Sequence, residues 1–280
     1  MPLSLLTLNL GAPSLDRAQR QLDWLATRPE DVLVLTETKA TPGTRHLAES
    51  LTAAGYTVTM PEHADGELGV MIASKLATHP DPLTDHLDHL PARATGVVID
   101  TDHGPVRVLG AYVPSRDASL DKTERKKRWT TGFLNALDAT RDDQPIILMG
   151  DLNVLEPDHQ PPHRGQFAPF EYDFYRALTH RCGLTDLYRH HHPDRVNHSW
   201  ARRPDLGYRY DHAHATPTLA DTLTTCDYIH ETRTHQTDGT RLTDHSGLAI
   251  TLALTPTTRL LTSDPTTVAA QHDEPEFTLF

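Results

Sequence analysis

The sequence is poor in the features that mark secreted and membrane proteins. It contains only two cysteines, Cys182 and Cys226, too few for a disulfide framework, so a reducing cytoplasm is the simplest location. It contains no run of about 18 apolar residues, which argues against a membrane-spanning helix. Residues 1–6 carry no basic segment ahead of their apolar positions, and we therefore expect no signal peptide.

Basic residues are also outnumbered: 26 lysines and arginines against 38 aspartates and glutamates give a formal net charge of −12. A protein that coats nucleic acid with its whole surface is normally basic, so the composition argues against that class. It argues less against an enzyme whose carboxylates surround a metal ion, since the ion reverses the local field. The 19 histidines include a triplet at 190–192. A solvated loop is favoured there over a zinc site, because no cysteine or second histidine group lies nearby at ligand spacing.

Short apolar runs alternate with amphipathic stretches along most of the chain. The runs predict strands at residues 3–8, 32–35, 56–60, 69–73, 94–100, 107–112, 146–149, 209–214, 227–231 and 248–254. Helical spacing predicts helices at residues 15–25, 45–54, 122–140 and 170–181. This mixture indicates an α/β sandwich with mixed sheets. The composition changes near residue 256, so we predict a folded domain over 1–255 and a flexible tail over 256–280.

Polar residues follow the predicted strands at the points where the strands end. They are Asn9, Glu37, Tyr112, Asp151 with Asn153, Asp211, and the pair Asp244 and His245 that precedes the last strand. Strand ends are where α/β proteins assemble sites from distant parts of the chain. One such residue is usually a turn former, but the repetition of the pattern in one chain favours a site.

The same residues carry a resemblance to a known family. The sequence contains, in order, Asn9, Thr-Glu-Thr-Lys at 36–39, Tyr-Val-Pro at 112–114, Gly-Asp-Leu-Asn at 150–153, Ser-Trp at 199–200, Tyr-Arg-Tyr-Asp at 208–211 and Thr-Asp-His at 243–245. This order resembles that of the exonuclease III and apurinic/apyrimidinic endonuclease family, within the endonuclease/exonuclease/phosphatase superfamily. The resemblance covers about residues 3–254. It implies a four-layered α/β sandwich, in which helices flank two packed mixed β-sheets.

The resemblance also implies a metal site that takes Mg²⁺, with Mn²⁺ as the alternative. Glu37 is similar to the family's main metal-binding carboxylate, and carboxylate oxygens suit a hard cation. Asn9 is expected to orient that ligand or the water around the ion. Asp244 is expected to lie near the ion.

The remaining strand-end residues resemble the family's catalytic set. Asp151 is expected to align, and to deprotonate, the attacking water, and Asn153 to hold that water or the phosphate. His245 is expected to face the phosphate while Asp211 binds its other ring nitrogen, which favours a charged imidazolium. Tyr112 is expected to donate a hydrogen bond to a phosphate oxygen. Such a set suits in-line attack of water on phosphorus.

The substrate implied by the resemblance is DNA with damaged sites or free 3′ ends. Trp200 and Tyr208 are expected to wall a sugar pocket, with a core position as the alternative for both and the favoured one for Tyr208. Arg202 and Arg203 are expected to meet the nucleic-acid backbone. The basic run at 122–128 is read as a solvated helix face rather than a phosphate contact.

Three functions remain open from the sequence. The first is a Mg²⁺-dependent DNA-repair nuclease with abasic-site endonuclease or 3′–5′ exonuclease activity. The second is a phosphodiesterase or phosphatase of the same fold that acts on RNA, a nucleotide or another phosphoester, since the segment between Trp200 and Tyr208 is short for a DNA-repair member. The third is a binding protein without turnover, which the complete polar set disfavours. A monomer is expected, and Glu276–Phe280 resembles a peptide that binds a bacterial sliding clamp.

Overall fold

Two six-stranded mixed β-sheets form the centre of the computed structural model, which describes residues 1–163, 165–203, 206–235 and 239–272. In the first sheet the strand order is β13-β14-β1-β2-β4-β3, with β1 and β2 parallel and the other pairs antiparallel. Its strands are β1 (Leu3–Asn9), β2 (Val32–Lys39), β3 (Thr57–Thr59), β4 (Leu68–Ser74), β13 (Leu223–Ile229) and β14 (Gly247–Leu252).

The second sheet has the order β5-β6-β7-β8-β12-β9, and β7 and β8 are its parallel pair. Its strands are β5 (His79–Pro80), β6 (Ala94–Thr101), β7 (Gly104–Tyr112), β8 (Ile146–Asp151), β9 (Thr185–Asp186) and β12 (Asp211–Ala215). A separate two-stranded ribbon consists of β10 (Trp200–Arg203) and β11 (Leu206–Tyr208).

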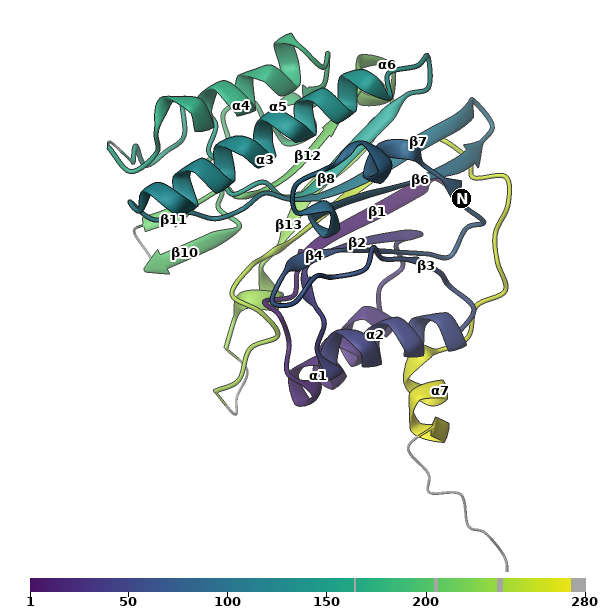
Figure 1. Ribbon diagram of the computed structural model, residues 1–280. Helices are drawn as coiled ribbons and strands as arrows, with labels where there is room; N and C mark the ends of the chain where they lie inside the picture. The colour runs from purple at the N-terminus through teal and green to yellow at the C-terminus, as the bar shows by residue number, and fades with distance from the viewer. Residues whose placement is uncertain (164, 204–205, 236–238, 273–280) are drawn as a thin grey trace, which may run out of the picture.

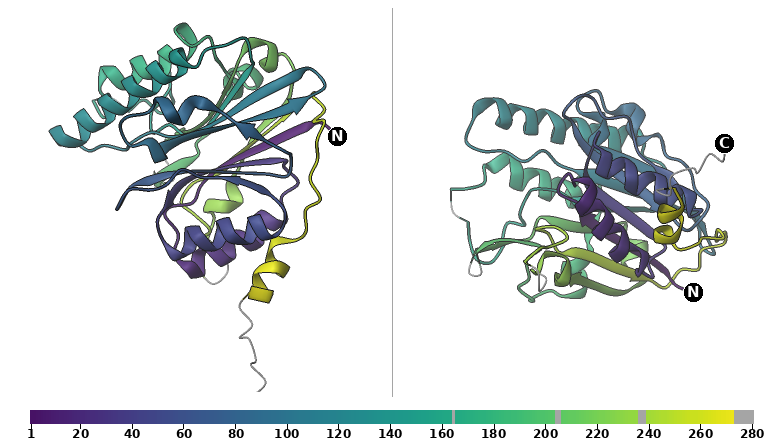
Figure 2. Two further views of the ribbon diagram at one scale, coloured as in Figure 1. Left: turned by 45° about the vertical axis from the view of Figure 1, so that its right-hand side comes forward. Right: turned by 90° about the horizontal axis from the view of Figure 1, so that it is seen from below.

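Helices cover the outer faces of both sheets, as Figures 1 and 2 show. The helices are α1 (Leu15–Ala26), α2 (Pro42–Ala53), α3 (Leu120–Ala139), α4 (Pro169–His180), α5 (Leu187–His191), α6 (Pro217–Ala220) and α7 (Pro265–His272), with short 3₁₀ turns at Pro82–His86, Pro91–Arg93 and His230–Arg233. Helices α1, α2 and α7 lie on the side of the first sheet, and α3 and α4 on the side of the second. The four-layered sandwich implied by the resemblance is confirmed.

Three apolar cores correspond to the three interfaces between these layers. The central core joins the two sheets and includes Val34, Val70, Val108 and Met149. One outer core packs leucines of β1 and β2 against α1 and α2. The other packs β7 and β8 against Trp129 and other side chains of α3 and α4. The strands are apolar on both faces because both faces are covered, which explains why their sequences read as continuous apolar runs.

The two sheets approach each other closely at Gly110, so a substitution there tests how tightly the central core is packed. A Cβ atom on Gly110 would lie 2.7 Å from Val70 Cγ1 and 2.9 Å from Val34 Cγ1, both in the opposite sheet. Gly110→Ala is therefore expected to lower the free energy of unfolding by about 1–3 kcal/mol, measured by urea denaturation. Gly132→Ala, in α3 with open space around the new methyl group, is the matched control and is expected to stabilise by about 0.5–1 kcal/mol. Equal effects at the two positions would contradict the close contact.

The structure differs from the sequence predictions mainly in short or polar elements. The strand expected at 227–231 spans Leu223–Ile229 instead, and its start was missed because exposed Thr224 and Thr225 interrupt the apolar pattern. The ribbon β10–β11 and the turns of α5 and α6 were not predicted. The histidine triplet was expected in a solvated loop, and this was wrong for its conformation: His190 and His191 are exposed but belong to α5.

The prediction of a flexible tail from residue 256 was wrong for the part that the structure describes. Pro256 forms a bridge with Thr101, and Arg259 forms one with Leu76. Arg259 also pairs with the buried carboxylate of Asp31, at 2.6 Å. Helix α7 then packs beside α1 and α2. Apolar and ionic contacts of this kind are hard to recognise in a short segment rich in threonine. The clamp-like peptide Glu276–Phe280 lies outside the described residues.

In the part of the chain that the structure describes, no helix combines the length and the apolar character that crossing a membrane requires.

Candidate active site

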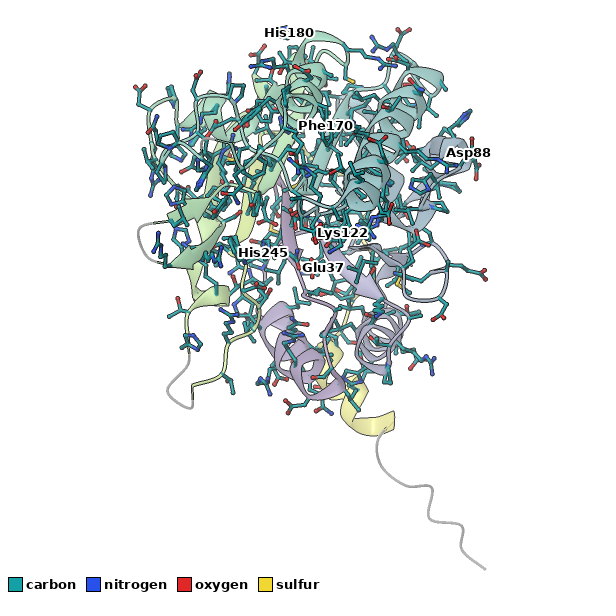
Figure 3. The ribbon with its side chains drawn as sticks, turned by 60° about the vertical axis from the view of Figure 1, so that its left-hand side comes forward. Glu37, Asp88, Lys122, Phe170, His180 and His245 are labelled. Carbon is teal, nitrogen blue, oxygen red and sulfur yellow. The ribbon has the colours of Figure 1, made fainter. Side chains whose placement is uncertain are left out.

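The polar strand-end residues meet at one edge of the two sheets. Parallel pairing brings the ends of β1 and β2 together and the ends of β7 and β8 together, with Tyr112 opposite Asp151. Strand β12 runs antiparallel to β8, so Asp211 at its start lies opposite Asp151. Figure 3 labels Glu37 and His245 at this edge. Side chains far apart in the sequence therefore surround one place.

Asp151 lies at the centre of this group and is almost fully buried. Its Oδ2 accepts a hydrogen bond from Asn9 Nδ2 at 2.8 Å, and its Oδ1 accepts one from the Asn153 backbone N–H at 2.9 Å. Burial, and then the charges of Asp211 and Glu37, raise the pKa of Asp151 to about 8, although His245 opposes the shift. Gly150 allows β8 to approach β7 here, because a Cβ atom would lie 2.0 Å from a backbone oxygen of β7.

Glu37 is positioned by an irregularity in β2. The pairing of β2 with β4 shifts register between Thr36 and Thr38, and Glu37 has a φ of +53°. A non-glycine residue in this left-handed region costs on the order of 1–3 kcal/mol, and such strain occurs often at functional sites. The bulge brings Glu37 Oε1 within 2.5 Å of the Tyr112 hydroxyl, which donates to it. Burial and the neighbouring carboxylates hold the pKa of Tyr112 well above its usual range, so the hydroxyl stays protonated.

His245 and Asp211 form a buried pair. The distance between His245 Nδ1 and Asp211 Oδ2 is 2.8 Å. Burial alone would lower the pKa of His245, but Asp211, together with Asp151 and Asp244, raises it to about 10. The Ser199 hydroxyl oxygen accepts a hydrogen bond from the Asp211 backbone N–H, which fixes the start of β12. His245 is therefore a cation whose other ring nitrogen, Nε2, remains for a further acceptor.

The site contains a set of atoms that can hold a metal ion. Ligand atoms of Asp151, Asp211 and His245 all lie within 4.8 Å of one another, and Asp211 Oδ1 is buried without a hydrogen-bond partner. A protonated His245 has no lone pair for a metal, however, so the carboxylates of this edge, including Glu37, are the better ligands. The amide of Asn9 is used differently, because its Oδ1 accepts the Gly11 N–H and its Nδ2 holds Asp151.

Asp244 and Trp200 form a second contact beside this group. Trp200 Nε1 donates to Asp244 Oδ2 at 2.8 Å, and the backbones of Trp200 and His245 form a bridge. The Trp200 ring lies 5.3 Å from Tyr208 and 6.0 Å from Tyr210, measured between centroids. An aromatic wall therefore borders the carboxylates. The sequence patterns did not single out Tyr210; its place two residues after Tyr208 on the same face of the chain was the available signal.

Arg202 and Arg203 are exposed on β10, beyond Trp200, so the structure places them outside the buried group.

Lys126 is a correction to the sequence analysis, which read the basic run as solvated. Its ammonium is buried and donates to Glu171 Oε1 and to the backbone oxygen of Asn153, both at 2.6 Å. Lys126 thus fixes the loop that carries Asn153. Lys122 and Lys127 of the same run are exposed.

Comparison with known proteins identifies the family. A model described as the endonuclease/exonuclease/phosphatase family matches residues 6–245. The DNA repair nuclease APEX1 of Danio rerio is 28% identical over 214 residues, which are 68% of this chain and 66% of that protein. An exodeoxyribonuclease of Bacillus subtilis (strain 168) is 26% identical over 140 residues, 46% of this chain and 56% of that protein. The alignments thus span less than two thirds of these relatives.

Solved structures share the fold. A variant of the 3′ phosphatase NExo from Neisseria, bound to a product DNA hairpin, superposes with a TM-score of 0.72 at 24% identity and covers 89% of this chain and 99% of its own. An AP endonuclease from Archaeoglobus fulgidus gives a TM-score of 0.71 at 23% identity with the same coverage. At this identity the likeness establishes the architecture.

Proposed function

The chain belongs to the endonuclease/exonuclease/phosphatase family, and from this premise we propose that it is a Mg²⁺-dependent DNA phosphodiesterase of the exonuclease III type. The observation that carries the proposal is the convergence of Glu37, Asp151 and the Asp211–His245 pair at one edge of the sandwich. The resemblance of the sequence blocks and the names of the relatives, a DNA repair nuclease and an exodeoxyribonuclease, support DNA as the substrate.

The side chains suit hydrolysis by water. The carboxylate of Asp151, which Asn9 and Asn153 hold in place, orients a water molecule toward phosphorus and accepts a proton from it. The His245 imidazolium, oriented by Asp211, donates a hydrogen bond to a phosphate oxygen and neutralises developing charge. Tyr112 holds Glu37 in place, because its one hydroxyl proton is donated to Glu37 Oε1 and not to a phosphate oxygen as the sequence analysis expected.

This edge fits a divalent cation, because the carboxylates of Glu37 and Asp151 both lie near Tyr112, and Asp211 Oδ1 is buried without a hydrogen-bond partner. Mg²⁺ prefers such oxygen ligands and supplies Lewis-acid stabilisation of the phosphoryl oxygens when bound. Glu37 is the proposed ligand, and Asp151 keeps the role of the base. Asp244 stays ionised, because His245 and Trp200 lower the pKa of its carboxyl against the effect of burial, so it adds negative charge to the same site.

Trp200 and Tyr210, which are half-buried, are proposed to contact the sugar next to the scissile bond, whereas Tyr208 is buried behind them, in the core position that the sequence analysis favoured for it. Their rings form a continuous wall, with Tyr208 and Tyr210 stacked at 5.1 Å. Extrusion of a nucleotide toward such a wall costs least where the base is already missing. Arg202 and Arg203, exposed beyond Trp200, are placed to meet the phosphate backbone.

The test is cleavage of a duplex that carries one abasic analogue, with Mg²⁺, compared with intact duplex, single-stranded DNA and RNA of the same sequence. We expect the abasic duplex to be cut fastest, and EDTA to abolish the reaction. Hydrolysis of RNA or a small phosphoester without cleavage of any DNA would replace the DNA assignment with the second candidate. Binding of all four substrates without turnover would exclude an enzymatic function.

A further inference from the structure

A second group of potential metal ligands lies on the opposite face of β12 from the candidate active site. Successive residues of a strand face opposite sides, so His212 and His214 point away from Asp211. His214 pairs across the ladder with Asp186 of β9. Asp186 Oδ2 lies 3.7 Å from His212 Nδ1 and 3.9 Å from His214 Nε2. All three side chains are buried, the two histidines completely.

The two histidines leave buried nitrogen atoms without partners. His212 Nε2 lies 3.1 Å from the backbone oxygen of Val154, so it carries the proton and leaves the Nδ1 lone pair free. Neither ring nitrogen of His214 has a hydrogen-bond partner. A buried polar atom without a partner destabilises the folded state, which calls for an explanation such as a bound ion.

We propose that Asp186, His212 and His214 form a second metal site, which takes a divalent first-row transition ion such as Zn²⁺. The ligand atoms lie within 4.8 Å of one another. Two bonds of about 2.0–2.1 Å at a tetrahedral angle separate their donor atoms by roughly 3.4 Å. The observed separations of 3.7 and 3.9 Å therefore need to close by a few tenths of an ångström.

The neighbours of the three ligands match the surroundings of known metal sites. Metal-binding histidines usually donate their second ring N–H to a backbone carbonyl, as His212 does to Val154. The Tyr175 hydroxyl and Arg209 Nη2 donate to Asp186 Oδ2 at 2.7 and 2.6 Å. Arg209 also pairs with Glu156, which Arg189 shares, so Glu156 offsets the charge of Arg209 only in part. Because Arg209 shares this carboxylate oxygen with the ion, we expect binding that EDTA reverses.

The donor chemistry distinguishes this site from the first, and a cavity lies beside its neighbours. A cavity of about 410 Å³ is lined by Tyr175, Glu156 and Arg189, which surround Asp186 and Arg209. Two imidazole nitrogens and one carboxylate favour zinc over Mg²⁺, which prefers oxygen ligands. Zinc at this position is therefore expected to persist in millimolar Mg²⁺, whereas ions at the strand-end carboxylates exchange with it.

The test is the zinc content of the full-length protein after equilibration with Zn²⁺ and removal of free ion in the presence of excess Mg²⁺. His214→Leu is expected to hold one equivalent less zinc than the unchanged protein. His190→Leu, which changes an exposed histidine on α5, is the matched control and is expected to keep it. Zinc at about 100 times its dissociation constant is expected to raise Tm by roughly 5–10 °C in the control and to lose this effect in His214→Leu.

Equal zinc content and equal Tm shifts in the two variants would overturn the proposal. Without zinc, His214→Leu is expected to be at least as stable as the unchanged protein, since it removes two unpartnered nitrogens. Should that variant fail to fold, anomalous diffraction from a zinc-soaked crystal of the unchanged protein decides. A peak between Asp186, His212 and His214 supports the site, and density for zinc only at the strand-end carboxylates contradicts it.

Discussion

Glu37→Gln is expected to lower the Mg²⁺-dependent rate of phosphodiester cleavage by about 10²–10³-fold, as loss of a preorganised charge-stabilising group does in other hydrolases. Glutamine keeps the size of the side chain and can still accept the hydrogen bond from Tyr112, which is 2.5 Å long in the structure. What it removes is the negative charge that the cation needs. Loss of a residue that only supports a metal ligand typically weakens metal binding by about 10–100-fold. The Mg²⁺ concentration for half-maximal rate is therefore expected to rise by at least as much in Glu37→Gln.

The measurement is a Mg²⁺ titration of the cleavage rate on the abasic duplex. Glu49→Gln, on the exposed side of α2, is the control and should leave both rate and Mg²⁺ requirement unchanged. Full activity of Glu37→Gln at low Mg²⁺ would contradict the metal assignment. Circular dichroism and urea unfolding of both variants show whether the fold is retained, since Glu37 occupies a strained position in β2.

The central strands of this fold could be predicted because they are buried on both faces, whereas the four-layered arrangement was implied by the family resemblance. Residues such as Val32–Leu35 and Ile146–Met149 are apolar throughout, and a polar residue after each run signals where the strand leaves the core. The positions of Asn9 and Asp151 at strand ends follow from the same pattern, whereas Glu37 lies at a bulge within β2, which continues to Lys39. Their meeting at one edge does not follow from the pattern, because it depends on which strands are parallel neighbours, and the family resemblance supplied that information.

Contacts between polar residues far apart in the sequence were beyond these patterns. Lys126 lies in a run of basic residues that looks solvated, yet it is buried against Glu171, 45 positions away. His212 and His214 follow Asp211 in an alternating stretch, but only the pairing of β12 with β9 places them beside Asp186. The segment 256–263 carries few apolar residues and is held by bridges and by Arg259, whose partner Asp31 gives no local signal.

The pH dependence of cleavage follows from two raised pKa values at the candidate site. The proposed base form of Asp151 is its carboxylate, so the rate is expected to rise with pH as this group, whose pKa is about 8, loses its proton. The proposed active form of His245 is the imidazolium, so the rate is expected to fall as pH passes its pKa of about 10. Bound Mg²⁺ favours the Asp151 carboxylate and disfavours the His245 imidazolium, so both limbs of the profile should lie at lower pH than these two pKa values. Because Asp151 and His245 interact, each apparent pKa describes the pair and not one residue.

Asp211→Asn is expected to move both limbs of this profile to lower pH, because the charge of Asp211 raises the pKa of Asp151 as well as that of His245. A histidine returned to its ordinary pKa of about 6.5 is only about 3% protonated at pH 8, so the rate there should fall by at least about 30-fold. Asp221→Asn, an exposed change after α6, is the control and should leave the profile in place. A purely structural role for Asp211 would lower the rate at every pH without moving the limbs. An alkaline limb that stays where it is in Asp211→Asn therefore means that His245 does not act as the charged partner of the phosphate.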